Sequence, residues 1–325
     1  MAVIKANAYG HGLMRAASAL RDADGFAVVE LDAAVRLREA GYDQRILLLE
    51  GFFSTDELDV IADCRITSVI HSVEQVAMLA GSHLTAPLDV FLKFNTGMNR
   101  LGFAASAFSK VHAQLSALPA VASVTLMTHF ANAEEKGGVD AQLHAFNVLT
   151  DKMALPRSLA NSAALIMEPR THGDWVRPGI MLYGSSPFVE RSAESLGLRP
   201  VMHLTSQLIA VQELAPGDSV GYGLTFRAER ARRIGVVACG YADGYPRHAP
   251  SGTPIGVAGV RTRLVGRVSM DMLCADITDI PHAAVGSNVL LWGDAVSVDE
   301  VAKAAGTVGY ELLCAISQRV PMMEV

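Results

Sequence analysis

Apolar positions in residues 1–200 form short continuous runs, and most runs are followed by a longer stretch with helical spacing. Strands are expected at residues 2–4, 26–29, 46–50, 68–71, 90–94 and 124–129. Helices are expected at residues 12–21, 31–40, 55–62, 73–80, 105–118 and 142–155, and a further short run at 169–171 ends near Trp175. Repeated strand–helix units with short connections predict a parallel sheet, and this many units favour a closed (β/α) barrel.

The pattern changes after about residue 204, where short β-prone runs replace helical periodicity. Strands are expected at residues 204–211, 233–239, 261–268, 272–276 and 288–292, with turn-forming residues between them and one helix at 297–305. Closely spaced strands of this kind predict a second, mainly antiparallel β domain. The chain is therefore expected to divide into a barrel domain, residues 1–203, and a β-rich domain, residues 204–325.

Composition narrows the possible function classes. Half of the 325 residues are hydrophobic, 18% are charged, and the formal net charge is -6, which indicates a packed globular protein without a basic nucleic-acid-binding stripe. No apolar run reaches the roughly 18 residues that span a bilayer, and the first residues lack the layout of a secretory signal. The four cysteines form no CxxC pair. We therefore expect a cytoplasmic protein with reduced thiols and no metal site, nucleic-acid partner or membrane association.

Lys5 closes the first apolar run, in the segment VIKANAYGHG at residues 3–12. Active sites of barrels collect at the C-terminal ends of the strands, and lysine is the side chain that forms imines with carbonyl cofactors. Tyr9, Gly10 and Gly12 follow in a loop whose amides and phenol could approach a phosphate. For a lysine taken alone, a surface amine at a strand end is the commoner interpretation.

Eight segments resemble, in the same order, segments of the alanine racemases. They lie at residues 3–12, 91–103, 127–133, 161–164, 175–184, 220–223, 239–247 and 266–271, and together they span most of the chain. The chain is identified by this resemblance as a member of the alanine racemase family, which uses pyridoxal 5'-phosphate. The resemblance implies an α/β fold, a (β/α)8 TIM-type barrel followed by a mainly β C-terminal domain. It also implies a homodimer in which the β domain supplies residues to the partner's active site.

The resemblance assigns the two proton-transfer groups that racemisation needs, one on each face of the substrate carbon. Lys5 would hold the cofactor as a Schiff base and act on one face, and Tyr222 of the partner's β domain would act on the other. A free phenol is a poor base at neutral pH, so nearby cations would have to stabilise its anion. His129 would join Tyr222 to Arg177 through hydrogen bonds. Without the resemblance, Tyr222 is an ordinary strand tyrosine and His129 a buried strand-end histidine.

Further residues would bind the cofactor. Arg177 would contact the pyridine nitrogen, where a guanidinium donates a hydrogen bond without giving up its proton; an arginine before a proline can equally cap a strand. Tyr9, Ser162 and the backbone amides of Gly179 and Ile180 would bind the phosphate. Ser162 alone could instead be a helix N-cap.

The substrate carboxylate would be bound by Arg100, through a guanidinium fork, and by the backbone amide of Met270 from the other subunit. Asp271 would support the neighbouring backbone or gate access to the site. Lys93 corresponds to a family lysine that is often carbamylated by carbon dioxide and then orients Arg100; an unmodified lysine in an ion pair is the alternative. Asn95 stands where many relatives have aspartate, and the missing charge would make the carbamate more useful.

The chain departs from the family pattern in two places. Gln318 stands where the family has a tyrosine near the phosphate, in residues 316–321, which puts that contact in doubt. Family members also have a strand and a helix before the lysine strand, whereas Lys5 is the fifth residue here. Three explanations stay open: a misassigned start, a truncated chain, or a fold that tolerates the gap. The N-terminal part of the barrel is expected to be incomplete, with unpaired edge groups, and a truncated chain could keep the site residues but lose stability, cofactor or activity.

The expected function is interconversion of L-alanine and D-alanine, with D-alanine supplied to peptidoglycan, although a catabolic alanine racemase would carry the same residues. Three alternatives stay open: a racemase of broader specificity that accepts serine, a decarboxylase on the same architecture, and a cofactor-binding protein without turnover. Arg177 and the segment around Tyr222 argue against a decarboxylase. The long β domain argues against a binding-only protein.

Overall fold

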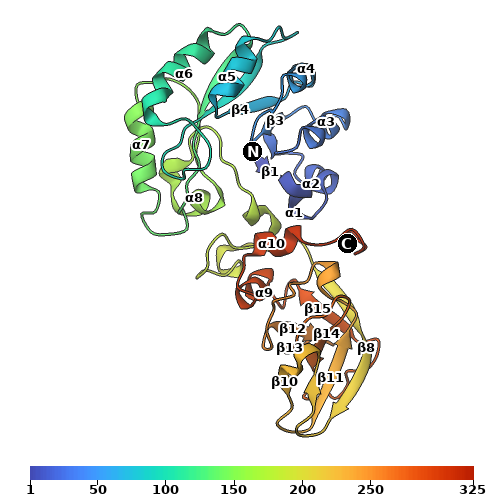
Figure 1. Ribbon diagram of the computed structural model, residues 1–325. Coiled ribbons are helices and arrows are strands. Elements are labelled where there is room, and N and C mark those ends of the chain that lie inside the picture. The colour runs from blue at the N-terminus through green and yellow to red at the C-terminus, as the bar shows by residue number, and fades with distance from the viewer. The chain divides into compact units, whose positions relative to one another are not determined.

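The computed structural model describes residues 1–325 and divides them into two compact units, Met1–Leu182 and Tyr183–Val325 (Figure 1). This division falls ahead of the boundary expected after residue 203, which stays a prediction. No helix in either unit combines the length and the hydropathy that a bilayer crossing requires.

Unit 1 contains a curled parallel sheet whose strands follow one another in chain order. They are β1 (Ala2–Val3), β2 (Gly25–Val28), β3 (Arg45–Leu48), β4 (Thr67–Ile70), β5 (Leu88–Lys93), β6 (Val121–Met127) and β7 (Arg157–Ser158). All four residues of β2 are buried, as are all four of β4, because helices cover one face of a parallel sheet and the strands fill the interior on the other. The predicted strand–helix alternation is confirmed.

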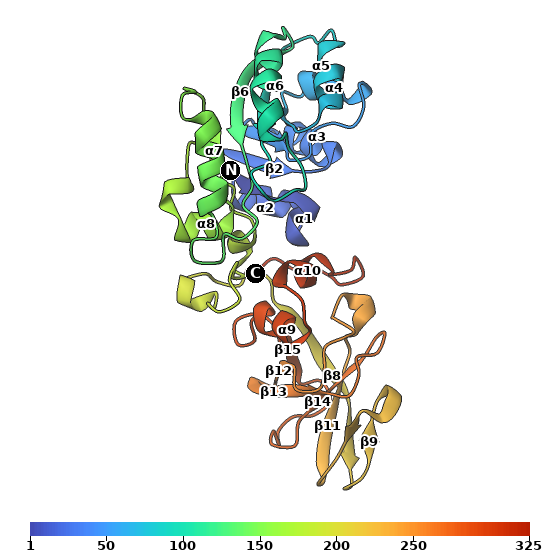
Figure 2. The ribbon, with the colours of Figure 1, turned by 60° about the vertical axis from the view of Figure 1, so that its left-hand side comes forward.

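Helices flank the sheet along its outside (Figures 1 and 2). They are α1 (Lys5–Tyr9), α2 (Leu13–Ala19), α3 (Leu31–Glu39), α4 (Asp56–Asp63), α5 (Val73–Ala80), α6 (Ala105–Ala117), α7 (Asp140–Thr150) and α8 (Ser162–Met167), followed by the 3-10 helices η1 (Pro169–Thr171) and η2 (Ile180–Tyr183). Their inward faces are apolar: Phe108, Val111 and Leu115 of α6 are buried, for example. This spacing is what one face of an α-helix requires.

Residues 175–178 join the two edge strands of the parallel sheet. Trp175 pairs in parallel with Ser158 of β7, and the amide of Arg177 donates to the carbonyl of Ala160 at 2.9 Å. On the other side, the amide of Val3 in β1 donates to the carbonyl of Pro178 at 3.0 Å. The edge of β1, expected to carry unpaired groups, is therefore hydrogen-bonded at this position.

Unit 2 is built around a closed barrel with the strand order β11-β14-β13-β12-β15-β8, all neighbours antiparallel. Its strands are β8 (Leu204–Leu214), β9 (Ser219–Val220), β10 (Phe226–Arg227), β11 (Arg232–Val237), β12 (Pro254–Val257), β13 (Val260–Val265), β14 (Leu273–Asp276) and β15 (Asn288–Trp292). Its helices are η3 (Glu194–Leu196), η4 (Tyr222–Leu224), η5 (Tyr241–Asp243), α9 (Val298–Ala304) and α10 (Gly309–Cys314). The predicted β domain with one helix near residue 300 is confirmed, and α10 was not predicted.

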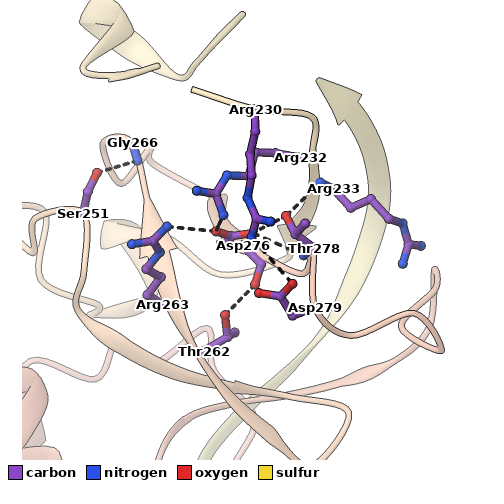
Figure 3. Close-up of polar contacts among 10 residues, drawn as sticks. All are labelled: Arg230, Arg232, Arg233, Ser251, Thr262, Arg263, Gly266, Asp276, Thr278 and Asp279. Carbon is purple, nitrogen blue, oxygen red and sulfur yellow. Dashed lines mark hydrogen bonds and ion pairs between the residues drawn. The ribbon is translucent and has the colours of Figure 1, made fainter. Parts of the chain in front are cut away.

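The buried carboxylate of Asp276 ties three strands of this barrel together (Figure 3). Its Oδ2 accepts from Nη1 of Arg232 in β11 at 3.0 Å and from Nη2 of Arg263 in β13 at 3.1 Å. Its Oδ1 accepts from the amide and hydroxyl of Thr278. Burial raises the pKa of Asp276, but hydrogen bonds from Thr278 and Arg263 outweigh burial and bring the pKa below its usual value. Asp276 is therefore ionised at neutral pH.

Candidate active site

Lys5 lies where strand β1 ends and the backbone turns into a left-handed helical turn. Ala6, Asn7, Ala8 and Tyr9 all have φ between 51° and 55°, a region that costs an L-residue roughly 1–2 kcal/mol. Four such residues in a row, none of them glycine, form strained backbone directly after the lysine. Strain of this kind persists where surrounding structure over-determines it, and it collects at functional sites.

Side chains from the same segment hold this turn in place. The side-chain carbonyl of Asn7 accepts from the amide of Leu13 at 2.8 Å. Nδ1 of the buried His11 lies 3.0 Å from the carbonyl of Ala8 and 2.9 Å from that of Tyr9. Because carbonyls only accept, Nδ1 of His11 must carry the hydrogen. Asn7 and His11 thus fix the backbone that follows Lys5, and neither was predicted to have a role.

Arg177 is buried at the C-terminal ends of the last strands, and hydrogen bonds to Ser158, Thr128 and Leu159 hold its guanidinium. Nη1 donates to the hydroxyl of Ser158 at 2.5 Å, and Nη2 donates to the carbonyls of Thr128 at 2.7 Å and Leu159 at 3.1 Å. Burial lowers its pKa to about 10, so the group stays charged at neutral pH. Its Nε–H donates to no acceptor in the chain and is left for a ligand.

His129 follows strand β6 and is held by Arg177, whose Nη2 lies 3.4 Å from its Nδ1. A guanidinium only donates hydrogen bonds, so Nδ1 is the acceptor and the hydrogen belongs on Nε2. Burial and the positive charges of Arg177 and Lys93 lower the pKa of His129 well below its ordinary value. The ring is therefore neutral at pH 7 and offers an Nε2–H donor.

Lys93 closes strand β5 and is almost fully buried, with 6% of its surface exposed. Burial, followed by the positive charges of Arg177 and Arg100, lowers its pKa to about 8, and Glu50 opposes the shift. The charge of Lys5 acts in the same direction. Several cations therefore converge on the ends of β1, β5 and β6, which is an environment suited to anions.

Tyr9, Ser162 and Gly179 meet in one small region of unit 1. The Gly179 amide donates to the hydroxyl of Ser162 at 2.8 Å. A Cβ atom at Gly179 would lie 2.6 Å from the Tyr9 hydroxyl, so only glycine leaves room there. The buried amide of Ile180 donates to no acceptor in the chain. Two hydroxyls and an unpaired buried amide form a cradle of the kind that binds phosphate oxygens.

The alternative role for Ser162 as an N-cap does not apply. Asn161 is the N-cap of α8, and its side-chain oxygen accepts from the amide of Ala164 at 3.0 Å. Ser162 is the first residue of the helix, and its hydroxyl is free to turn toward the amide of Gly179.

The loop that carries Arg100 is organised by Asn95. The side-chain oxygen of Asn95 accepts from the amides of Gly97 at 3.1 Å and Asn99 at 3.0 Å. The loop closes where the Phe103 amide donates to the carbonyl of Lys93 at 3.0 Å. Arg100 itself is exposed. An amide at position 95 thus supports the loop by accepting backbone hydrogen bonds and needs no charge.

The remaining predicted residues lie in unit 2. Tyr222 is 73% exposed, in the tight turn of η4, which begins after Gly221 with φ of 76°. Met270 is 53% exposed, and its amide donates to no acceptor in the chain. Asp271 pairs with Arg319 at 2.8 Å. Gln318 is exposed.

The structure thus brings the unit 1 residues together at the C-terminal ends of the parallel strands: Lys5, Tyr9, Lys93, His129, Ser162, Arg177, Gly179 and Ile180. Tyr222, Met270 and Asp271 belong to the other compact unit, and their meeting with Lys5 stays a prediction. Ser158 and Thr128, which hold Arg177, were missed because nothing local to them signals a contact with a residue so far along the chain.

Comparisons with known proteins agree in sequence and in fold. Residues 1–187 match the family model described as alanine racemase, N-terminal domain, and residues 201–324 match alanine racemase, C-terminal domain. The chain is 60% identical over 322 residues to an alanine racemase of Nitrosospira multiformis, covering 98% of this chain and 90% of that protein. It also resembles the crystal structure of a biosynthetic alanine racemase from Pseudomonas aeruginosa, with a TM-score of 0.96 at 51% identity over 99% of this chain and 90% of that one. An Acinetobacter baumannii alanine racemase is similar, with a TM-score of 0.91 at 39% identity over 98% of this chain and 90% of that one.

Proposed function

The chain belongs to the alanine racemase family, and from that membership we propose that it interconverts L-alanine and D-alanine with Lys5 and Tyr222 as its two proton-transfer groups. One observation carries the proposal: a lysine, a neutral histidine and a buried arginine converge beside a cradle of hydroxyls and amides. Lys5 belongs to unit 1, and Tyr222 would come from a second copy of the chain.

The residues of unit 1 fit pyridoxal 5'-phosphate. Tyr9, Ser162 and the amides of Gly179 and Ile180 would hold the phosphate, because they supply hydrogen-bond donors in a space that a Cβ atom at Gly179 would fill. The unpaired Nε–H of Arg177 would donate to the pyridine nitrogen. When bound, the cofactor withdraws electrons from the substrate α-carbon and so makes its hydrogen acidic.

Lys5 and Tyr222 would move the proton. Nζ of Lys5 would anchor the cofactor in the resting enzyme and then take up or give a proton on one face of the α-carbon. Oη of Tyr222 would do the same on the opposite face. Removing the proton on one face and returning it on the other inverts the carbon, which is why two groups are needed.

His129 would couple Tyr222 to Arg177. With Nδ1 accepting from Arg177, the Nε2–H of His129 is free to donate to the Tyr222 oxygen and stabilise its anion. The neutral state of His129 suits this role, because the positive charges around it oppose protonation.

Arg177 would also control the outcome of the reaction. A guanidinium donates a hydrogen bond to the ring nitrogen but keeps its own proton. It therefore limits how much negative charge is drawn away from the α-carbon and favours rapid return of a proton there. Side reactions such as transamination, which need longer-lived delocalisation, would be suppressed.

Substrate binding and assembly complete the proposal. Arg100 and the Met270 amide of the partner would bind the substrate carboxylate. Lys93 would be carbamylated, since its lowered pKa supplies neutral amine and the surrounding cations favour an anion there. The exposed apolar side chains of Tyr222 and Leu224 in η4 would be covered in a homodimer.

The cellular setting is proposed to be the cytoplasm, with D-alanine supplied to peptidoglycan. None of the four cysteines is in a disulfide, which fits a reducing compartment. The same residues would serve a catabolic alanine racemase equally well.

The test is α-hydrogen exchange in deuterium oxide, with each enantiomer of alanine and of serine, on protein loaded with pyridoxal phosphate. Exchange of alanine with inversion is the expected result. Comparable inversion of serine would indicate broader specificity, and release of carbon dioxide would indicate a decarboxylase. Tight cofactor binding with neither reaction would contradict the proposal and favour a binding-only protein.

A further inference from the structure

The loop at residues 269–272 carries Met270. Backbone amides of the short helix η5 donate hydrogen bonds to this loop. The amide of Tyr241 donates to the carbonyl of Ser269 at 3.0 Å, and the amide of Ala242 donates to the carbonyl of Met270 at 2.9 Å. A Cβ atom at Gly240 would lie 2.3 Å from the Met270 carbonyl oxygen. Only glycine lets the two backbones approach this closely.

Helix η5 and Gly244 after it also contact the segment at residues 315–319. The Ser317 amide donates to the carbonyl of Asp243 at 3.1 Å. Gly244, with φ of 105°, leaves no room for a Cβ atom, which would lie 2.4 Å from the Ala315 carbonyl oxygen. Residues 240–244 therefore contact both the Met270 loop and this segment.

Asp243 anchors this arrangement and is largely buried, with 17% of its side chain exposed. Its Oδ2 accepts from the amide of Gly240 at 2.8 Å, and its Oδ1 accepts from Nε of Arg319 at 2.7 Å. Burial raises the pKa of Asp243, but the Arg319 and Gly240 hydrogen bonds outweigh burial and lower it. The neighbouring thiol of Cys239 stays protonated, because burial raises its pKa to about 12.

Arg319 connects this anchor to the loop. While its Nε donates to Asp243, its Nη2 pairs with Oδ1 of Asp271 at 2.8 Å. Asp271 directly follows Met270, an exposed residue whose amide donates to no acceptor in the chain. One planar guanidinium thus spans two carboxylates, which a lysine ammonium cannot do with the same geometry.

We infer that Arg319 and Asp243 are positioning residues that hold the Met270 amide in the orientation needed to bind the substrate carboxylate. The inference rests on the proposed function and extends it to two residues that touch neither substrate nor cofactor. A backbone amide contributes to binding only when it is aimed at its ligand. The ion pair with Asp271 fixes one end of the loop, and the hydrogen bonds from η5 fix the other.

Arg319→Met tests this directly. We expect KM for both alanine enantiomers to rise about tenfold while kcat changes little, because carboxylate binding is shared by the ground state and the transition state. The inhibition constant of propionate, which has the carboxylate and methyl group of alanine without the amine, should rise by a similar factor. Arg319→Lys should restore part of the loss.

Arg230→Met is the matched control, since Arg230 is an exposed arginine of the same unit, 3.7 Å from Asp279. The KM of this variant should equal that of the wild type.

Asp271→Asn is a second test variant. It removes the ion pair between Arg319 and the exposed Asp271 and keeps the hydrogen bond between Arg319 and Asp243. In the double variant, the change in KM should be far smaller than the two single changes combined, because Asp271→Asn and Arg319→Met break the same contact. Unchanged KM and propionate binding in both single variants would overturn the inference. A fall in kcat with unchanged KM would overturn it equally.

Amide hydrogen exchange of residues 269–272 tests the positioning without turnover. Exchange should be faster in Arg319→Met than in the wild type or Arg230→Met, at equal melting temperature. Equal exchange rates in all three proteins would contradict the inference. If the wild type fails to racemise alanine, the proposed function falls, whereas exchange and propionate binding still decide the role of Arg319.

Discussion

Nη2 of Arg177 lies 3.4 Å from Nδ1 of His129, and this contact sets the tautomer of the histidine. Because the guanidinium can only donate, the imidazole must accept at Nδ1 and present its hydrogen at Nε2. A buried arginine thus controls a neighbouring proton donor while its own Nε–H stays available. His129 follows strand β6, and Arg177 lies in the segment that pairs with the neighbouring strand β7, which is why the curled sheet brings the two residues together.

Exchanging Arg177 for a carboxylate should change which reaction occurs. Arg177→Glu would offer the ring nitrogen a carboxyl proton and strengthen electron withdrawal, so transamination should increase relative to racemisation. The ratio is measured from pyruvate formed per racemisation event. Ser158→Ala is the control, because it removes one hydrogen bond to Nη1 but keeps the guanidinium. An unchanged ratio in a folded Arg177→Glu protein would contradict this role.

Gly179→Ala should weaken cofactor binding. The new Cβ atom would lie 2.6 Å from the Tyr9 hydroxyl and displace it from the phosphate cradle. We expect the dissociation constant of pyridoxal phosphate to rise about tenfold or more, a change of about 1.4 kcal/mol, measured by absorbance titration of the apoprotein. In Gly81→Ala the added atom would have only an ordinary contact, 3.6 Å from the Ala77 carbonyl oxygen. Equal affinities in the two variants would refute the cradle.

Lys93 should take up carbon dioxide in a pH-dependent manner. Its pKa of about 8 means that the amine is protonated below that pH and increasingly neutral above it, and only the neutral amine reacts. With ¹³C-labelled bicarbonate, a carbamate resonance should grow between pH 6.5 and pH 8.5 and be missing in Lys93→Met. Because the folded state releases this proton more easily than the unfolded state, Lys93 should also make stability rise with pH above about 8. No carbamate signal at pH 8.5 would rule out the modification.

Asp276→Asn should destabilise unit 2. The substitution leaves Arg232 and Arg263 without their shared carboxylate, at an expected cost of about 3 kcal/mol, measured by urea unfolding. The folded pKa of Asp276 is lowered, so its contribution is present above the unfolded pKa and is lost as the pH falls through the folded value. The difference from the wild type should therefore shrink in acid. Asp279→Asn, at an exposed pair, should stay within about 0.5 kcal/mol of the wild type, and equal losses in both variants would contradict the account.

Much of the fold could be predicted because its signals are local. The strand–helix alternation of unit 1 follows from continuous apolar runs such as Gly25–Val28, which are buried over their whole length. The helix near residue 300 follows from the capping box of Ser297 and Glu300. Both are readable from neighbours in the sequence.

Other features depend on contacts between distant residues, which the local sequence pattern does not predict. The left-handed turn after Lys5 contains Ala6 and Ala8, which prefer ordinary helix; long-range packing and the Asn7 side chain override that preference. The link from Arg319 to Asp243 joins residues 76 positions apart. The candidate site residues of unit 1 were predicted only through the family resemblance, since a lysine or arginine alone does not distinguish a cofactor site from a surface charge.

Complementation between two inactive variants tests the shared two-base site most directly. Lys5→Ala and Tyr222→Phe would each be inactive alone, and the exposed Tyr222 can lose its hydroxyl without harming the fold. In a co-refolded equimolar mixture, random pairing into the proposed homodimer makes half of the dimers hybrids, each with one intact pair of Lys5 and Tyr222. We predict recovery of about a quarter of the wild-type racemase activity. A mixture that forms hybrid dimers but stays inactive, or either variant retaining wild-type turnover alone, would contradict the account.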